Sequence, residues 1–302
     1  MELIPLLLLI IICAALLAGY PVALTLGGIS ILFALICIPF GIFDPTIFGS
    51  IPIRIFGIMN NVTLLAVPLF IFMGTILEKS GIAASMLKNM ALAFRSVKGG
   101  LSISIIVVGA LLAASTGIVG ATVVTMGLMS LPILINQGYD KSFSAGLVAS
   151  TGTLGQIIPP SIALVLLGDV MSNAYQRAQN DMGIFSQQTV TVGDLFIGAI
   201  VPGVLICIGY LIYTIYKNQT SPSINDQTVD SKINIISLFK TLALPFLLIF
   251  LVLGSIFAGI ATPTEAAAIG AFGSLIIALV NGKITFAFIK ESSEKTAIVS
   301  TM

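Results

Sequence analysis

Two short stretches of this sequence contain the residues whose types and spacing could do chemistry. They are STGTLGQIIPPSI at residues 150–162 and ASTGIVGAT at residues 114–122. Their hydroxyl groups and exposed backbone carbonyls are hard oxygen ligands, which a hard cation such as Na+ prefers. The candidate ligands are Ser150, Thr151, Gly152 and Thr153 in the first stretch and Ser115, Thr116 and Gly117 in the second. We therefore predict one sodium site, provided that the fold brings the two stretches together.

A purely structural role is the alternative for these residues. Glycines allow helices to pack closely, and serine or threonine hydroxyls within a helix can donate to a carbonyl of the same helix. For Gly109, Gly127 and Gly146 we favour close packing. For the two hydroxyl-rich stretches we favour the cation site.

The elements that must position these residues are membrane helices. The chain has 302 residues, of which 57% are hydrophobic and only 8% charged, and its mean hydropathy of +1.14 is typical of an integral membrane protein. Uninterrupted apolar runs predict an all-α polytopic fold. The expected spans lie near residues 4–18, 22–39, 62–78, 142–173, 194–216, 241–258 and 264–281.

Both chemistry-bearing stretches interrupt this pattern. Residues 100–136 form two apolar halves of about 15–18 residues, roughly 22–27 Å of helix each, against a hydrocarbon core of about 30 Å. A re-entrant hairpin with its tip at Ser115–Gly117 fits this length better than the alternative of two full spans. In 142–173, Pro159 and Pro160 prevent one continuous helix. Unwound backbone at membrane depth must line a cavity or lie buried in protein, so the break predicts a site.

Three further segments have local interpretations. Residues 82–97 are amphipathic and form either a helix along the membrane interface or an ordinary loop helix. Residues 217–235 are polar and predict a solvent-exposed linker. Thr262-Pro263-Thr264-Glu265 predicts a capped helix start, with a proton-coupling role for Glu265 as the alternative.

The distribution of lysine and arginine predicts the orientation of the chain. With the N-terminus outside, only Arg54 and Arg177 among the 13 basic residues fall on the outer side. The remaining 11 (13 − 2) fall on the cytoplasmic side, as the positive-inside rule requires.

Several classes of function are disfavoured. The net charge of +1 and the absence of a basic cluster argue against nucleic acid, and a chain without histidine lacks the commonest general base. Asp140 and Asp169 resemble the aspartates of intramembrane proteases, but they are about 43 Å apart if the segment between them is helical. We therefore expect no enzyme and no cofactor other than Na+ as a coupling ion.

The motifs as a set resemble a known family. GYPVALTLG (19–27), LLAVPLFIFMGTILEKSGIA (64–83), GQIIPPSI (155–162), GAIVPG (198–203) and GIATPTEAAAIGA (259–271) are similar to the large, DctM-like membrane subunit of tripartite ATP-independent periplasmic (TRAP) transporters. Order and spacing match from residue 1 to about residue 285. The hairpin tip departs from the serine-rich tip of many members.

The resemblance implies a sodium-driven importer of organic acids, such as C4-dicarboxylates, in the bacterial inner membrane. It implies an elevator-type transport domain in a multi-pass chain, with a periplasmic substrate-binding protein and a small membrane subunit as partners. For an inner-membrane protein, the orientation given by the basic residues puts the N-terminus in the periplasm. Ser115, Thr116, Gly117, Ser150, Thr151, Gly152 and Thr153 match sodium-site positions. Gln156 and Pro159, together with Thr153, would border the substrate.

The family also implies a domain plan made of two inverted repeats. Residues 1–99 would be scaffold-type helices with the interfacial helix, 100–175 the hairpin and interrupted helix, 176–235 a span and linker, and 236–302 scaffold-type helices leading into a second repeat. No second IIPPS-like break follows in these 302 residues. We expect a fragment, or a protein whose remainder is encoded elsewhere.

Two other functions stay open. One is a sodium- or proton-coupled carboxylate carrier that uses no binding protein. The other is a non-transporting scaffold subunit, which would have no need of a hairpin facing a broken helix.

Overall fold

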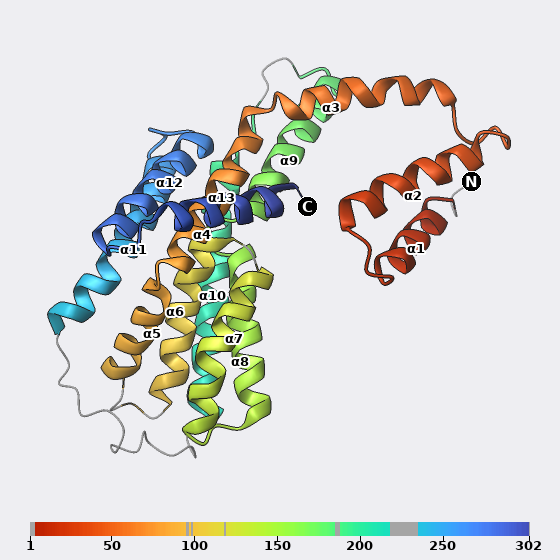
Figure 1. Cartoon of the computed structure of the whole chain (residues 1–302). Coiled ribbons are helices and arrows are strands. Elements are labelled where there is room, and N and C mark those ends of the chain that lie inside the picture. Colours follow the sequence, from red (N-terminus) through yellow and green to blue (C-terminus); the bar gives the residue numbers. More distant parts are fainter. Residues whose placement is uncertain are drawn as a thin grey trace. The chain divides into compact units, whose positions relative to one another are not determined.

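A computed structural model describes residues 4–94, 97, 99–117, 119–184, 188–217 and 235–301 (Figure 1). The side chains of residues 83, 113, 115, 116, 121 and 235–241 lie outside this description. Within the described ranges the regular structure is entirely helical. This confirms the predicted all-α fold class. Contacts divide the chain into two compact units, Met1–Asn61 with Ile298–Met302, and Val62–Ala297.

The first unit contains the N-terminal helices. Helices α1 (Ile4–Leu16) and α2 (Val22–Cys37) pack against each other, and a 3-10 turn (Pro45–Ser50) leads into α3 (Ile51–Met59). Asp44 caps that turn by accepting a hydrogen bond of 2.9 Å from the backbone N–H of Thr46, and this bond lowers the pKa of Asp44. Most side chains of α1 and α2 are apolar and exposed, as expected of helices that contact lipid.

The second unit is a helical bundle. Its elements are a 3-10 turn (Val62–Leu65), α4 (Ala66–Lys79), α5 (Ile82–Ala93), α6 (Gly100–Thr116), α7 (Val119–Asn136), α8 (Lys141–Thr153), a 3-10 turn (Leu154–Gln156), α9 (Ile162–Asp181), α10 (Val192–Lys217), α11 (Ile235–Phe257), α12 (Pro263–Val280) and α13 (Phe286–Thr301) up to Ala297. Helix α6 is central, because it contacts α4, α5, α7, α8, α10 and α11. Its Ile105, Ile106 and Val108 are at most 1% exposed. An all-round apolar helix is expected in such a position.

The observed helices agree with the predicted spans. Three of the described helical segments are long and apolar enough to cross a membrane: Val62–Lys79, Val192–Lys217 and Pro263–Val280. Two helices were not predicted, α3 and α13. The predicted domain boundaries at 99, 175 and 235 stay a prediction, as does the linker, because residues 218–234 lie outside the described ranges.

Two local predictions can be compared with the structure. Helix α5 exists, and its Met86, Leu87 and Met90 are buried in the hydrophobic core, where α5 contacts α6 and α11. Whether α5 also follows a membrane interface stays a prediction. At the start of α12, the backbone N–H of Thr262 donates to Glu265 Oε2 at 2.8 Å, and the Glu265 N–H donates back to Thr262 Oγ1 at 3.4 Å. This capping box confirms the predicted helix start.

Candidate functional site

The first part of the candidate site is a helical hairpin. Helix α6 ends at Thr116 and α7 begins at Val119, and the two helices pack against each other (Figure 1). Gly117 between them has a φ of +59°, a left-handed conformation that residues with a Cβ rarely adopt. The hairpin is therefore confirmed as a pair of helices. Its re-entrant course in a membrane stays a prediction.

The second part is the break between α8 and α9. Helix α8 ends at Thr153, a single 3-10 turn follows, and α9 starts at Ile162. Ser161 caps α9, because its Oγ accepts from the Leu164 N–H at 3.5 Å while donating to the Gln156 carbonyl at 2.8 Å. The predicted interruption is thus present, and Pro159 and Pro160 lie buried within it.

The hairpin tip and the helix break contact each other directly. Gln156 Nε2 donates a hydrogen bond of 2.8 Å to the carbonyl oxygen of Gly117. The Ile162 side chain closes the other side, since a Cβ at residue 117 would lie 3.2 Å from Ile162 Cγ1. Two segments about 40 residues apart in sequence therefore form one junction, which we call the tip–break junction: Gly117, Gln156 and Ile162.

Farther from the tip, glycines allow α8 to pack closely against both arms of the hairpin. A Cβ at Gly109 of α6 would lie 3.0 Å from Thr151 Cβ, and one at Gly152 of α8 would lie 3.0 Å from the Cα of Val123 in α7. Thr151 is consequently fully buried. Gly109 precedes Gly117 by about two turns, roughly 12 Å along α6. Thr151 therefore faces the middle of the hairpin arm, whereas Gln156 faces the tip.

The hydroxyls of α8 donate to their own helix. Thr151 Oγ1 lies 2.8 Å from the Leu147 carbonyl and 3.1 Å from that of Val148, Ser150 Oγ lies 3.0 Å from the Leu147 carbonyl, and Thr153 Oγ1 lies 2.7 Å from that of Ser150. These are the bonds of the structural alternative. A hydroxyl that donates still has lone pairs, so these oxygens also remain able to accept from a ligand or coordinate a cation. The side chains of Ser115 and Thr116 lie outside the described part, so the cation site stays a prediction.

The predicted substrate residues differ in accessibility. Thr153 is exposed, Gln156 is half-buried with its amide nitrogen bonded to the hairpin tip, and Pro159 is buried. Of these three, Thr153 offers the most accessible side chain. Gln156 has an evident second task, which is to hold the tip against the break.

The three glycines expected to serve close packing behave differently. Gly109 packs tightly against Thr151, as predicted. A Cβ at Gly127 would make only an ordinary contact, 3.9 Å from Val148 Cγ1. For Gly146 the prediction was wrong: no atom lies within 4 Å of where its Cβ would be, because this residue faces a groove between α8 and α10.

A charged cluster near the hairpin was not predicted. Glu78 at the end of α4 accepts from Thr125 Oγ1 of α7 at 2.6 Å and pairs with Lys295 Nζ of α13 at 2.9 Å. The adjacent Lys79 pairs with Glu291 of the same helix α13, also at 2.9 Å. The sequence does contain a pattern that could have indicated this cluster. Glu78 and Lys79 directly follow an apolar run, and Glu291 and Lys295 are spaced four residues apart, which puts them on one face of a helix. The cluster ties one arm of the hairpin to α4 and α13.

We expect Glu78→Gln to lower the free energy of unfolding by about 0.5–1 kcal/mol, because glutamine keeps an acceptor for Thr125 but removes the partly exposed ion pair with Lys295. The side chains of Glu78 and Lys295 are 19% and 34% exposed. Denaturation of the purified protein in detergent measures the effect. Lys290→Gln is the matched control, since its 3.9 Å pair with Glu294 is more than 60% exposed on both sides and should contribute almost nothing. Equal effects of both variants would contradict a role for the cluster.

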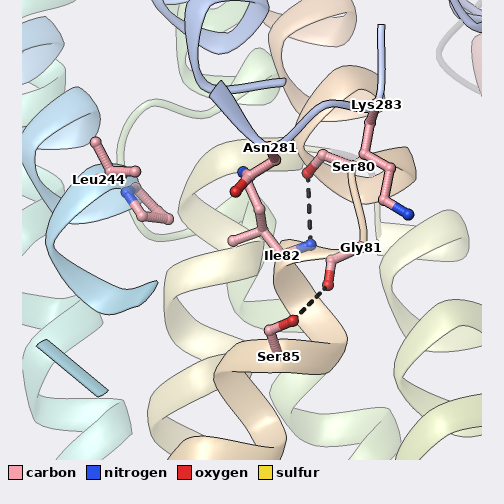
Figure 2. Close-up of a pocket in the computed structure, with 8 residues that line it drawn as sticks. Ser80, Gly81, Ile82, Ser85, Leu244, Asn281 and Lys283 are labelled. Atoms are coloured by element: carbon pink, nitrogen blue, oxygen red, sulfur yellow. Dashed lines mark hydrogen bonds between the residues drawn. The ribbon is translucent and has the colours of Figure 1, made fainter. Parts of the chain in front are cut away.

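Two cavities elsewhere in the second unit are less suited to this chemistry. A cavity of about 450 Å³ lies at the α4–α5 turn. The Ser80 hydroxyl there accepts from the Ile82 N–H at 3.5 Å, and the Ser85 hydroxyl donates to the Gly81 carbonyl at 3.3 Å. Figure 2 shows these two bonds among the lining residues. These hydroxyls stabilise the turn itself. Asp169 lines a cavity of about 380 Å³, whereas Asp140 lines the groove beside α10.

Comparison with known proteins identifies the family. The family described as the DctM component of tripartite ATP-independent periplasmic transporters matches residues 9–302. The chain belongs to the DctM family. It is 30% identical over 274 residues to the C4-dicarboxylate TRAP transporter large permease protein DctM of Rhodobacter capsulatus, and 33% identical over 273 residues to that of Vibrio cholerae. These alignments cover 89% and 90% of the chain, but 59% and 55% of the two relatives.

Membership of the DctM family confirms the resemblance seen in the motifs. The family model describes a transporter component, and these two relatives are named as permease proteins rather than as enzymes. Another relative is the isethionate TRAP transporter permease protein DctMQ of Oleidesulfovibrio alaskensis, 31% identical over 238 residues, with 76% of this chain and 34% of that protein covered.

Proposed function

We propose that this DctM-family chain is the membrane permease component of a sodium-driven, binding-protein-dependent importer of organic acids. The observation that carries the proposal is the tip–break junction, in which the Gln156 amide bonds to the Gly117 carbonyl. A hairpin tip against an interrupted helix places backbone oxygens and helix ends around one point. That is the construction by which membrane transporters hold an ion and a substrate.

The substrate class is supported by the relatives. The names of four of them specify C4-dicarboxylates, isethionate, ectoine and sialic acid, each of which carries an acid group. We infer an organic acid for this chain as well, bound near Thr153, Gln156 and Pro159. Sodium would be held by oxygens of Ser150, Thr151 and Gly152 together with those of Ser115, Thr116 and Gly117.

The same proposal includes partners and orientation. TRAP systems are tripartite, so a periplasmic substrate-binding protein and a small membrane subunit are expected beside the permease. The chain would lie in the bacterial inner membrane with its N-terminus in the periplasm, as the basic residues indicate. Residues 100–175 would move as the transport domain of an elevator.

Uptake into liposomes tests the function. The permease would be reconstituted with its partner subunits, and uptake of a radiolabelled C4-dicarboxylate compared in Na+ and K+ gradients without ATP. We expect uptake to fall at least about tenfold when K+ replaces Na+, because K+ is too large for a site built for Na+. Equal uptake with both ions would refute sodium coupling. Uptake that persists without the binding protein would instead favour a sodium- or proton-coupled carboxylate carrier that uses no binding protein.

We expect cysteine labelling to place the two ends of the bundle on opposite sides of the membrane. In a background without Cys13, Cys37 and Cys207, Met182→Cys should react with a membrane-impermeant thiol reagent in intact spheroplasts. Lys283→Cys should react only after permeabilisation. Both parent residues are exposed, so burial does not explain a difference. The opposite labelling pattern would invert the proposed orientation.

A further inference from the structure

A groove lies between α8 and α10, away from the tip–break junction. It has a volume of about 540 Å³ and runs along two turns of each helix. Phe143 and Leu147 of α8 and Tyr213 of α10 give it apolar walls, and the rings of Phe143 and Tyr213 are 6.4 Å apart. One end carries Asp140 and Lys217. The groove thus combines an apolar interior with a charged end.

A buried hydroxyl in the wall of this groove has no partner. Thr214 is 1% exposed, and its Oγ1 forms no hydrogen bond within the described structure. Buried polar groups in native proteins are nearly always bonded, so a hydroxyl without a partner that lines a cavity is available to a ligand. A ligand with an acceptor oxygen would complete it.

The charges at the end of the groove define the ligand further. Asp140 caps α8 by accepting from the Ser142 N–H at 3.2 Å, and Lys217 is the last residue of α10. Within the described residues, neither side chain forms an ion pair. A carboxylate and an ammonium that line one cavity without pairing are complementary to a ligand that carries both a positive and a negative group.

The position of the groove matches the level of lipid headgroups. Helix α10 has 26 residues. This corresponds to about 39 Å, which exceeds the hydrocarbon core of about 30 Å, so its ends reach the headgroup regions. Tyr210 and Tyr213 near that end are typical of the aromatic belt at a membrane surface. Within the groove, Phe143, Leu147 and Tyr213 give an acyl chain an apolar surface to lie against.

We propose that this groove binds a phospholipid whose headgroup carries a phosphate and a primary ammonium. The phosphate lies at Lys217 and the Thr214 hydroxyl, the ammonium lies at Asp140, and the start of an acyl chain lies against Phe143, Leu147 and Tyr213. A free phosphate would leave both Asp140 and these apolar walls unused. The proposal requires α10 to span the membrane. Ser150 lines the groove and also belongs to the proposed sodium site, but Asp140, Thr214 and Lys217, which carry the lipid proposal, do not.

Native mass spectrometry of the purified protein tests this site. Phosphatidylethanolamine, phosphatidylcholine and phosphatidylglycerol with identical acyl chains would be added in turn. All three have the phosphate, but only the first has a primary ammonium that donates hydrogen bonds. We expect phosphatidylethanolamine to bind about tenfold more tightly than the other two, as a charge-assisted hydrogen bond requires. Equal binding of the three lipids would overturn the proposal.

Variants of the groove residues test which side chain contacts the phosphate and which contacts the ammonium of the headgroup. Asp140→Asn keeps a good helix cap and should abolish the preference for phosphatidylethanolamine. Lys217→Gln should lower the affinity for all three lipids by about tenfold. Thr214→Val should lower these affinities by a smaller factor, about threefold. Lys283→Gln, at the separate cavity of Figure 2, is the matched control and should change nothing.

Two results would refute the lipid site. One is lipid binding that is unchanged in both Asp140→Asn and Lys217→Gln. The other is complete competition by water-soluble phosphoethanolamine at the same concentration as the lipid, because the apolar walls of the groove would then contribute nothing. Unchanged binding by the parent protein in excess phosphoethanolamine supports the proposal.

Discussion

Replacing Gln156 with leucine is expected to reduce transport by about 100-fold while the protein stays folded. The Gln156 amide is the donor that holds the Gly117 carbonyl at 2.8 Å, and Gly117 is buried. Leucine has similar volume but no donor, so the buried carbonyl loses its partner. An unsatisfied buried acceptor costs about 1–3 kcal/mol, which corresponds to roughly a 5- to 150-fold smaller population of the closed junction.

Spin labels measure the junction itself. With the native cysteines removed, labels at Gly120 and Ala163 report the distance between the start of α7 and the start of α9; both residues are exposed. The parent should give one narrow distance distribution, and Gln156→Leu a broad one shifted to longer distances. Sodium-dependent uptake would be measured on the same variants.

A matched control separates this effect from the loss of any amide hydrogen bond. The Asn173 amide also donates to a backbone carbonyl at 2.8 Å, but that carbonyl belongs to Asp169 in the same helix. Asn173→Leu should leave both the distance distribution and uptake close to those of the parent. If Gln156→Leu keeps a narrow distribution and normal uptake, the tip–break junction has no functional role.

Much of the fold was predictable because the membrane restricts the possibilities. Long apolar runs can only be helices there, and Pro159 and Pro160 can only interrupt one. The capped start at Thr262 was predictable for the same reason, since Thr-Pro-Thr-Glu satisfies its own backbone groups locally. In each case the determining interactions lie within a few residues of sequence.

The missed helices show the limit of such local patterns. Helix α13, FAFIKESSEKTAIVST, has low hydrophobicity, and its sequence is as typical of a polar tail as of a helix. Its Glu291 and Lys295 find partners on α4, more than 200 residues away, and no local pattern contains those pairs. Helix α3, IPIRIFGIM, has only nine residues, with a proline at the second position and Arg54 at the fourth, so it did not meet the criteria for a span.

The candidate site was predictable in its parts and less so in its contacts. The sequence located the hairpin tip and the break, because serine, threonine and glycine mark both and proline marks the break. It could not show that Gln156 bonds to Gly117 while Thr151 faces Gly109, because these contacts depend on how far α8 is shifted along α6. Gly146 was misjudged for the same reason, since a glycine that faces a groove looks identical in sequence to one that faces a helix.

Gly152→Val is expected to produce the largest loss of stability, about 3 kcal/mol or more. A Cβ at this position would lie 3.0 Å from the Cα and 3.1 Å from the backbone nitrogen of Val123. Backbone atoms cannot rotate away as a side chain can, so α7 and α8 must separate. Overpacking of a well-packed contact typically costs about 1–3 kcal/mol, and the branched valine side chain places this variant at the upper end or beyond.

Gly209→Val in α10 is the matched control for this variant. It makes the same substitution inside a helix, but no atom lies within 4 Å of the position of its Cβ, so only the difference in helix propensity remains. We expect a change in the free energy of unfolding within about 1 kcal/mol, because valine and glycine are both moderate to poor helix formers.

Unfolding by increasing mole fractions of SDS in mixed micelles measures both variants. Helix α8 contains Thr151 and Thr153 and leads directly into the turn that contains Gln156. Separation of α7 from α8 should therefore also abolish sodium-dependent uptake. A Gly152→Val protein as stable and as active as the Gly209→Val protein would show that α8 is not held against the hairpin at this contact.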